Sequence, residues 1–348
     1  MSRGSFSDRI ITWYRENQRD LPWRNTRDPY MIWLSEIILQ QTRVNQGLPY
    51  YLQFIEKYPT VFDLAKAEEV QVLRTWQGLG YYSRARNLHK CARQIVSEFN
   101  GEFPSNYDAL VNLPGIGPYT ASAIASFAFG RNEAVVDGNV MRVLSRFFGM
   151  RSDISSSGGM KEFRETAKMV LPDANTEDYN QGIMEFGAIQ CTPAVPDCKA
   201  CPLNGDCIAR MKGIQNELPL KLTKARIVSV HFTYFVFQHA DKIWMKERGK
   251  GIWQGLFDFY LIESRLEEPG KWLEEYLNTS FDLGNIVHKE HVLSHRRIYA
   301  SFVPVFISDP STSSVPGSDG RFFDIGQIGQ LPKPILIEWY LNSRHGIE

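Results

Sequence analysis

The sequence has no long apolar run and no excess of either charge. A transmembrane helix needs roughly 18–20 consecutive apolar residues, and no run in the 348 residues approaches that length. The N-terminal segment MSRGSFSDRI also lacks the hydrophobic region of a signal peptide. We therefore expect a soluble, cytoplasmic protein. Its 39 basic and 39 acidic side chains balance to a net charge of zero, so overall charge gives no sign of a polyanionic partner.

Length and composition predict two folded domains. With 43% hydrophobic and 22% charged residues, the chain can build packed cores. Residues 1–213 have mainly the apolar spacing of helices joined by short loops. Residues 214–226 are polar and poor in aromatic side chains, which favours a linker. Residues 227–348 contain VSVHFTYFVFQ and IYASFVPVFIS, two strand-like segments beside a short helical pattern, so the second domain is expected to be α+β.

Four of the five cysteines fall within one short segment, with the spacing C-x6-C-x2-C-x5-C: Cys191, Cys198, Cys201 and Cys207. Because the cytoplasm keeps thiols reduced, two disulfides are the weaker interpretation. Four thiolates this close can surround one metal centre, either a tetrahedral zinc ion or a four-iron, four-sulfur cluster. Zinc sites usually have two tight cysteine pairs and this sequence has one, which favours iron–sulfur without excluding zinc.

Two glycines lie in LPGIGPYTA, residues 113–121, between two helical patterns. Gly115 and Gly117 permit a tight turn and a close approach of the backbone to a ligand. The helix that follows exposes N–H groups at the positive end of its dipole, which suits an anion. A helix–hairpin–helix that binds DNA phosphate is the functional interpretation, and an ordinary turn between helices is the alternative.

Two acids stand out against apolar surroundings. Glu36 is surrounded by apolar residues in the middle of DPYMIWLSEIILQQTR, residues 28–43, a pattern typical of a buried helix. Burial raises the pKa of a carboxyl group and keeps its proton near neutral pH, so Glu36 is either a catalytic acid or part of a buried ion pair. Asp137 ends a short apolar run, where it is either a helix N-cap or a second catalytic carboxyl group. Cleavage of a glycosidic bond uses two such acids, one protonated and one ionised.

A set of motifs resembles the MutY-type adenine DNA glycosylases, which belong with endonuclease III to the helix–hairpin–helix family. In order, the motifs are WLSEIILQQT, GLGYYSRARNL, LPGIGPYTA, VVDGNVMRVLSR and the cysteine spacing. GKGIWQGLFDFYLIE and VLSHRRIYASF resemble the family's C-terminal Nudix-like domain, which recognises 8-oxoguanine. The resemblance implies an all-α helix–hairpin–helix glycosylase domain with a [4Fe–4S] cluster in residues 1–213, a linker in 214–226 and an α+β Nudix-like domain in 227–348.

The resemblance also implies a reaction. The enzyme would hydrolyse the N-glycosidic bond of adenine mispaired with 8-oxoguanine or G in double-stranded DNA and leave an abasic site. Glu36 would protonate the adenine at N7, and Asp137 would stabilise the developing sugar cation, with Asn139 helping to hold it and the water. Tyr119 stands where bifunctional relatives carry a lysine that forms a Schiff base. We therefore expect a monofunctional enzyme.

Other residues match those by which this family handles an extruded base. Four resemble the residues that wedge into the duplex beside 8-oxoguanine: Gln41 and Tyr81, with Thr42 and Leu79 close by. Three resemble the pocket that reads adenine: Trp23, Arg24 and Gln181, although a solvent-facing position is the alternative for Gln181.

In the second domain, Ser294 and His295 match the family's loop that contacts 8-oxoguanine, and Leu293 stands where relatives often have phenylalanine. The signature of Nudix hydrolases, G-x5-E-x7-R-E-x2-E-E, is absent after Gly255, so nucleotide hydrolysis is not expected.

Two other functions remain as alternatives. An endonuclease III-like glycosylase/lyase for oxidised pyrimidines is opposed by Tyr119 and by the second domain. A non-catalytic iron–sulfur DNA-binding protein is opposed by Glu36 and Asp137, because a binding protein has no need of a buried acid at that cost. We expect a monomer associated with the nucleoid and not with a membrane. Its partners would be DNA and, at the linker, a repair or replication protein.

Overall fold

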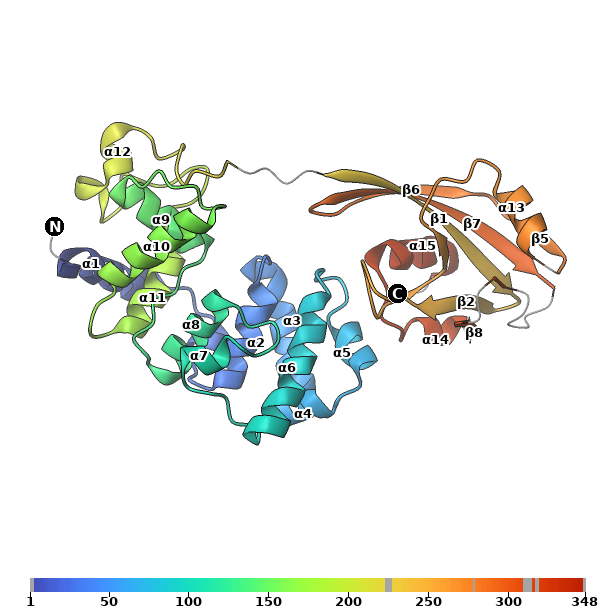
Figure 1. Cartoon of the computed structure of the whole chain (residues 1–348), viewed down its shortest axis with the longest axis horizontal. Coiled ribbons are helices and arrows are strands. Elements are labelled where there is room, and N and C mark those ends of the chain that lie inside the picture. The colour runs from blue at the N-terminus through green and yellow to red at the C-terminus, as the bar shows by residue number, and fades with distance from the viewer. Residues whose placement is uncertain (1–2, 223–226, 278, 309–314, 317–318, 347–348) are drawn as a thin grey trace. The chain divides into compact units, whose positions relative to one another are not determined.

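The computed structural model describes residues 3–222, 227–277, 279–308, 315–316 and 319–346 (Figure 1). The chain forms two compact units. The first contains Met1–Ala65 and Lys90–Lys224, and the second contains Lys66–His89 and Ala225–Glu348. The predicted domain boundaries at residues 213 and 227 stay a prediction, and residues 223–226 of the predicted linker lie outside the described residues.

The described part of the first unit is built from helices, as predicted (Figure 1). No helix of the described residues is both long enough and apolar enough to span a membrane. The elements that lie wholly or partly in this unit are α1 (Arg3–Asn17), η1 (Pro22–Arg24), α2 (Pro29–Leu39), α3 (Val44–Lys57), α4 (Val61–Lys66), α6 (Ser83–Phe99), α7 (Tyr107–Leu110), α8 (Pro118–Phe129), α9 (Gly138–Phe148), α10 (Ser157–Val170), α11 (Thr176–Glu185), η2 (Phe186–Gln190), η3 (Asn204–Asp206) and α12 (Ile208–Lys212).

Acidic caps begin the two helices associated with the predicted catalytic acids. Asp28 precedes α2, and its Oδ1 accepts a hydrogen bond from the backbone N–H of Tyr30 at 2.8 Å. Asp137 precedes α9, and its Oδ1 accepts from the N–H of Val140 at 2.7 Å. Gly149 ends α9 with a left-handed φ of 69°, which glycine adopts without strain. Asp137 is therefore a helix cap whatever else it does.

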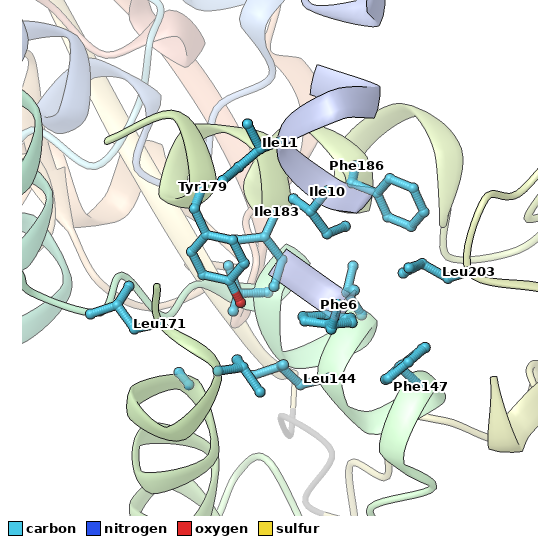
Figure 2. Packing of buried hydrophobic residues seen from close by; sticks show 14 of the residues in the cluster. Phe6, Ile10, Ile11, Leu144, Phe147, Leu171, Tyr179, Ile183, Phe186 and Leu203 are labelled. Carbon is cyan, nitrogen blue, oxygen red and sulfur yellow. The ribbon is translucent and has the colours of Figure 1, made fainter. Parts of the chain in front are cut away.

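A core of apolar side chains joins α1, α9, α10 and α11 (Figure 2). The rings of Phe6 and Phe147 lie with their centroids 4.6 Å apart. Full burial of one such side chain contributes roughly 1.5–3 kcal/mol. α11 comes close to α1 at Gly182, where an added Cβ atom would lie 3.0 Å from Cβ of Tyr14. This packing holds α9 and α11, which both reach the candidate site.

α2 is buried on nearly every side, as its apolar pattern predicts, and it packs against α3 and α8. Trp33, Leu34 and Ile38 of α2 have no exposed surface. Glu36 lies in the same helix and is only 8% exposed. The facing helix α8 is likewise buried from Thr120 to Phe127. Glu36 is therefore largely buried within a buried helix.

The second unit contains a mixed sheet whose main path is β3-β2-β1-β7-β5, with β4 paired to β1, β6 to β7 and β8 to β2. β1 and β7 run parallel over most of their length, from Val228 opposite Arg296 to Gln238 opposite Phe306, and the other pairs are antiparallel. The α+β prediction is confirmed. The elements are α5 (Glu69–Thr75), β1 (Val228–His239), β2 (Lys242–Glu247), β3 (Phe257–Asp258), β4 (Tyr260–Ile262), α13 (Pro269–Tyr276), β5 (Phe281–Leu283), β6 (Val287–Val292), β7 (Arg296–Ile307), β8 (Gly320–Asp324), α14 (Ile325–Ile328) and α15 (Ile335–His345).

Alternate side chains of β1 pack into two apolar cores, one on each face of this sheet. Tyr234 and Val236 pack with residues of α15 on one face. Phe235 and Phe237 pack with residues of α13 on the other. The turn between β6 and β7 is closed by the N–H of Leu293, which donates to the carbonyl of Arg296 at 2.7 Å. Two predicted lesion-reading residues thus lie at the tip of a hairpin supported by the sheet.

Candidate active site

A cavity of about 590 Å³ lies in the first unit, among residues of η1, α2, α3, α8, α9 and α11. It is the place where residues predicted from distant parts of the sequence meet. Eight of them line it: Trp23, Arg24, Glu36, Thr42, Tyr119, Asp137, Asn139 and Gln181. The volume is in the usual range of ligand pockets, which is roughly 300–1,000 Å³.

Glu36 presents a carboxyl group with an altered proton affinity to this cavity. Burial raises its pKa from 4.5 to about 7, and the nearby Asp137 adds to the rise. A hydrogen bond from the hydroxyl of Tyr119 and the charge of Arg24 oppose the rise without cancelling it. Glu36 can therefore hold a proton, and release it, near neutral pH.

Asp137 has different surroundings, although burial raises its pKa as well. Its Oδ1 accepts from the N–H of Val140 and its Oδ2 from the side-chain amide of Asn139, each at 2.7 Å. These bonds and the charge of Arg142 partly offset the rise in the pKa of Asp137. The N-terminal end of α9 also favours a negative charge there.

When the two carboxyl groups share one proton, Glu36 is the group that keeps it. Two adjacent buried acids cannot both ionise without a large cost. Asp137 has donors directed at both of its oxygens, whereas Glu36 has mainly the Tyr119 hydroxyl. The surroundings of the two groups therefore favour the proton on Glu36 and the negative charge on Asp137. Tyr119 stays a neutral phenol, because burial and the two acids raise its pKa well above 10.

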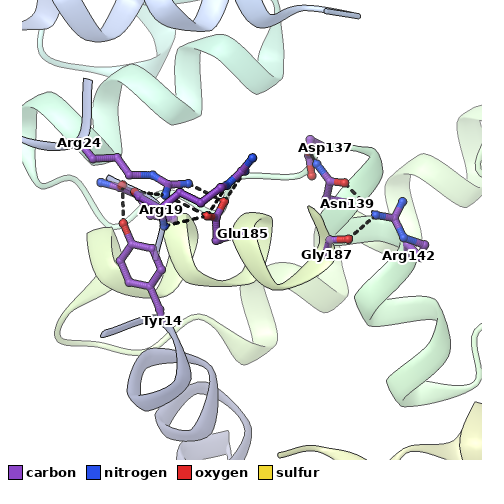
Figure 3. Close-up of polar contacts among 9 residues, drawn as sticks. Tyr14, Arg19, Arg24, Asp137, Asn139, Arg142, Glu185 and Gly187 are labelled. Carbon is purple, nitrogen blue, oxygen red and sulfur yellow. Dashed lines mark hydrogen bonds and ion pairs between the residues drawn. The ribbon is translucent and has the colours of Figure 1, made fainter. Parts of the chain in front are cut away.

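An ion-paired group that the sequence interpretation missed forms one wall of the cavity (Figure 3). Glu185, at the end of α11, is 1% exposed and binds two arginines. Arg24 Nη2 and Arg19 Nη2 each donate to its Oε2 at 2.7 Å. Burial by itself would raise the pKa of Glu185, but the hydrogen bonds from Arg19 and Arg24 outweigh it and lower the pKa to about 2. The guanidinium of Arg24 also lies over the ring of Tyr14, 5.7 Å from its centroid.

The sequence carries a signal for Glu185 that resembles the one for Glu36. Glu185 is the lone acid of IMEFGAI, an apolar segment, and a buried acid in such a segment needs a partner or a function. Gln181, one turn earlier, also lines the cavity, and its Oε1 accepts from the hydroxyl of Tyr14 at 2.8 Å. Gln181 is therefore not a purely solvent-facing residue.

A second hydrogen-bond network holds Asn139, which in turn binds Asp137 (Figure 3). Arg142 Nη2 donates to Asn139 Oδ1 at 2.8 Å and to the carbonyl of Gly187 at 2.6 Å. A side chain at position 187 would not fit, because its Cβ would lie 2.6 Å from Cβ of Asn139. The amide of Asn139 is thereby oriented, with its oxygen toward Arg142 and its nitrogen toward Asp137.

The four clustered cysteines lie beyond Arg142 in the same unit, where they are half-buried and not joined in disulfides. Burial raises the pKa values of Cys198, Cys201 and Cys207, and the nearby sulfur of Cys191 adds to each rise. No three His, Cys, Asp or Glu side chains in the described part of the chain are arranged to hold a single metal ion. A [4Fe–4S] cluster is larger than one ion and takes four thiolates, so this donor set fits it.

The remaining predicted residues lie outside the cavity. Gln41 and Tyr81 are both exposed and both have a left-handed backbone, with φ of 56° and 49°, which is strained for residues other than glycine. Leu79 is buried. Gly115 has a φ of 76°, which favours glycine. Gly117 instead has an extended φ of −91° and is the N-cap residue of α8.

Tyr81 belongs to the second unit together with the predicted lesion-reading residues. Its hydroxyl donates to Ser294 Oγ at 2.8 Å, and Ser294 Oγ lies 3.2 Å from Nδ1 of His295. These three side chains form one exposed polar group.

Comparison with known proteins finds two families in the chain. Residues 34–169 match the HhH-GPD superfamily base excision DNA repair proteins, and residues 233–343 match the NUDIX domain. The adenine DNA glycosylase of Buchnera aphidicola subsp. Acyrthosiphon pisum is 35% identical over 85% of this chain and 86% of its own length. The human adenine DNA glycosylase is 42% identical over 62% of this chain and 41% of its own length. A solved thermostable thymine-DNA glycosylase covers 60% of this chain and 97% of its own, with 34% identity and a TM-score of 0.56.

The ion pairs of Glu185 lead to a prediction about stability. Glu185→Ala leaves two arginines without their carboxylate, so the free energy of unfolding at neutral pH should fall by about 3 kcal/mol in urea titrations. The matched control is Glu165→Ala, which removes an exposed partner of Lys161 and should cost no more than about 0.5 kcal/mol. Equal losses in the two variants would contradict the prediction.

The same pair also predicts how stability changes with pH. Because the pKa of Glu185 is lowered from 4.5 to about 2, its contribution is fully present above pH 4.5 and is lost as the pH falls toward 2. The stability difference between the wild type and Glu185→Ala should therefore shrink across that interval.

Proposed function

The chain belongs to the adenine DNA glycosylase family of base-excision repair, and from that premise we propose how it releases the base and on which mispairs it acts. The proposed substrate is adenine paired with 8-oxoguanine or G in double-stranded DNA, and the product is an abasic site. The observation that carries the mechanism is the pair of unlike carboxyl groups, Glu36 and Asp137, in one cavity.

Glu36 is the general acid of the proposed reaction. Its protonated carboxyl group donates a proton to N7 of the extruded adenine, and the base then leaves as a neutral molecule. A carboxyl group with the ordinary pKa of 4.5 would be ionised at neutral pH. Burial in α2 keeps the proton on Glu36 until the base arrives, and a pKa of about 7 allows the proton to be regained after each turnover.

Asp137 stabilises the positive charge that develops on the sugar as the bond to adenine breaks. Its negative charge is held by Val140 and Asn139, so it is in place before the transition state forms. Water then completes the hydrolysis. We propose a monofunctional enzyme, because the residue in the place of the Schiff-base lysine is Tyr119, a neutral phenol without a nucleophilic amine.

Other residues that line the cavity suit adenine. Trp23 provides an aromatic ring, which is set edge-on to Tyr51 with the centroids 5.0 Å apart. Gln181, Arg24 and Glu185 line the same cavity and offer both donors and acceptors to the edge of a purine. We propose that Glu185 joins the predicted residues in reading adenine, since its carboxylate can accept a hydrogen bond from the exocyclic amine.

We propose a [4Fe–4S] cluster on Cys191, Cys198, Cys201 and Cys207. When bound, such a cluster would shape the surrounding loop. The residues of the chain perform the base chemistry, because Glu36, Asp137 and Tyr119 line the cavity and the cysteines do not.

The second unit is proposed to recognise 8-oxoguanine through the tip of the β6–β7 hairpin. Ser294 and His295 are exposed there and carry polar groups that can contact the edge of the oxidised base. Gln41 and Tyr81 are proposed as wedge residues, because both side chains are exposed at positions with a left-handed backbone.

The reaction should leave the DNA strand intact. In single-turnover reactions on an 8-oxoguanine:A duplex, strand breaks should appear only after hot alkali, because the enzyme leaves an intact abasic site. Breaks without alkali, in a nuclease-free preparation, would show that another amine acts as a nucleophile. Absence of adenine release would overturn the proposed substrate.

Glu36 should be needed for base release. Glu36→Gln removes the proton donor and nearly preserves its shape, so base release should fall by about 10³-fold while DNA binding is retained. In the wild type the single-turnover rate should decline as the pH rises through about 7, because the protonated form is present below the pKa and is lost above it. A wild-type rate in Glu36→Gln would remove this residue from the mechanism.

The β6–β7 hairpin should determine the preference for 8-oxoguanine. His295→Ala should reduce the preference for 8-oxoguanine:A over G:A by about 5- to 10-fold, the loss expected for one hydrogen bond, with less effect on catalysis itself. The control is His288→Ala, which removes another exposed histidine of the same unit, bonded to Ser301. An unchanged preference in His295→Ala would show that the hairpin does not read the lesion.

A further inference from the structure

Arg146 is a buried cation for which the described residues provide no acidic partner. It lies on α9, one turn after Arg142, and is 3% exposed. Among the described residues, no carboxylate forms an ion pair with it, and its side chain donates hydrogen bonds to carbonyl oxygens and one sulfur. A buried guanidinium is costly unless a negative charge compensates it. A compensating anion must therefore come from a group other than Asp or Glu.

The hydrogen bonds of Arg146 point to the cysteine centre. Its Nη1 donates to the carbonyl of Thr192 at 2.7 Å, to the carbonyl of Cys191 at 3.3 Å and to Cys191 Sγ at 3.4 Å. Its Nη2 donates to the carbonyl of Pro193 at 2.8 Å. The backbone carbonyl of Arg146 also lies 3.4 Å from Cys207 Sγ. One residue thus touches the first and the last of the four cysteines.

Arg142 adds a second buried cation beside the same cysteine. It is 9% exposed, and its Nε donates to the carbonyl of Cys191 at 2.8 Å. Two like charges four residues apart on a helix repel each other, and burial strengthens the repulsion. Four thiolates around a metal centre carry net negative charge, so a loaded centre would compensate both guanidinium groups.

The remaining donor of Arg146 reaches the segment that leads out of the first unit. Its Nε donates to the carbonyl of Leu218 at 3.1 Å. Leu218 is 2% exposed. Further along, the N–H of Ile154 donates to the carbonyl of Leu220 at 3.0 Å, and the N–H of Leu222 donates to Asp153 Oδ1 at 3.3 Å. Much of the predicted linker is therefore bound to the first unit, up to residue 222.

We propose that Arg146 is a positioning residue of the cysteine centre, which supplies the counter-charge for its metal-bound thiolates and ties the segment 218–222 to it. The inference rests on the metal centre proposed above. It adds that the position of segment 218–222 depends on that centre. When the metal is lost, it no longer holds residues 191–193, which accept the hydrogen bonds of Arg146. The guanidinium then loses its fixed position, and the bond to Leu218 is lost with it.

The test compares the full-length wild type with Arg146→Gln, Arg146→Lys and Arg164→Gln. Arg164→Gln is the matched control, because it makes the same change at an exposed arginine of α10 in the same unit. Metal content is measured by elemental analysis, and metal release is timed in excess chelator. Hydrogen exchange is followed in peptides that contain the amides of Ile154 and Leu222, before and after chelation.

Arg146→Gln should release metal at least about 10-fold faster than the wild type, as for loss of other groups that support metal ligands. Its Ile154 and Leu222 amides should exchange, with metal bound, as fast as those of the chelated wild type. Arg146→Lys should fall between, because it keeps the charge but cannot make all the bonds. Arg164→Gln should behave as the wild type.

Other outcomes would overturn the inference. Wild-type release from Arg146→Gln would remove Arg146 from the centre while leaving the metal centre itself in place. Unchanged exchange at Ile154 and Leu222 when the wild type is chelated would remove the link to the segment, and this comparison stands even if Arg146→Gln fails to fold. A wild-type protein without bound metal would overturn the proposed centre together with the inference.

Discussion

The burial of Glu36 is the constraint on which the rest of the site depends. An acid keeps its proton at neutral pH only where ionisation is costly, and α2 provides such a place because it is buried on nearly every side. The neighbouring acid has to remain charged in the same cavity. The structure meets both demands by giving Asp137 the N–H of Val140, the amide of Asn139 and the N-terminal end of α9, while Glu36 is left with little more than a phenol. The difference between the two acids thus arises from their neighbours.

The same separation of roles extends outward through the first unit. Glu185 is buried as deeply as Glu36, yet two arginines hold it ionised with a pKa of about 2. One cavity therefore contains carboxyl groups with very different proton affinities. One suits the donation of a proton, one the stabilisation of a cation and one the acceptance of a hydrogen bond. The apolar core formed by α1, α9, α10 and α11 keeps these groups in register, since α9 carries Asp137 at its start and α11 carries Glu185 at its end (Figure 2).

Much of this arrangement could be predicted from the sequence, and the remainder shows where such prediction stops. Glu36 was visible because an acid in an apolar helix is costly, and the four cysteines were visible because their spacing is short. The helical first unit and the α+β second unit followed from apolar periodicity. The ion pairs of Glu185 join residues more than 160 positions apart. No local sequence pattern therefore predicts which residues it pairs with. The same holds for Arg142 and Arg146, which look like ordinary solvated charges in NVMRVLSRFF until the fold places cysteine backbone beside them. Gly117 appeared to need glycine's conformational freedom, whereas its backbone is extended.

α9 joins two sites that differ in chemistry, and its regularity limits how the gene can change. Asp137 begins the helix and Arg146 lies near its end, so their relative direction is set by the number of residues between them. Each added or removed residue turns an α-helix by about 100° and shifts it by about 1.5 Å. A deletion of one codon in this interval would direct the arginines away from the cysteines, or the cap away from the cavity. Substitutions between them can accumulate, but insertions and deletions cannot. We therefore expect the length of this segment to be more constant over evolution than the identity of its residues.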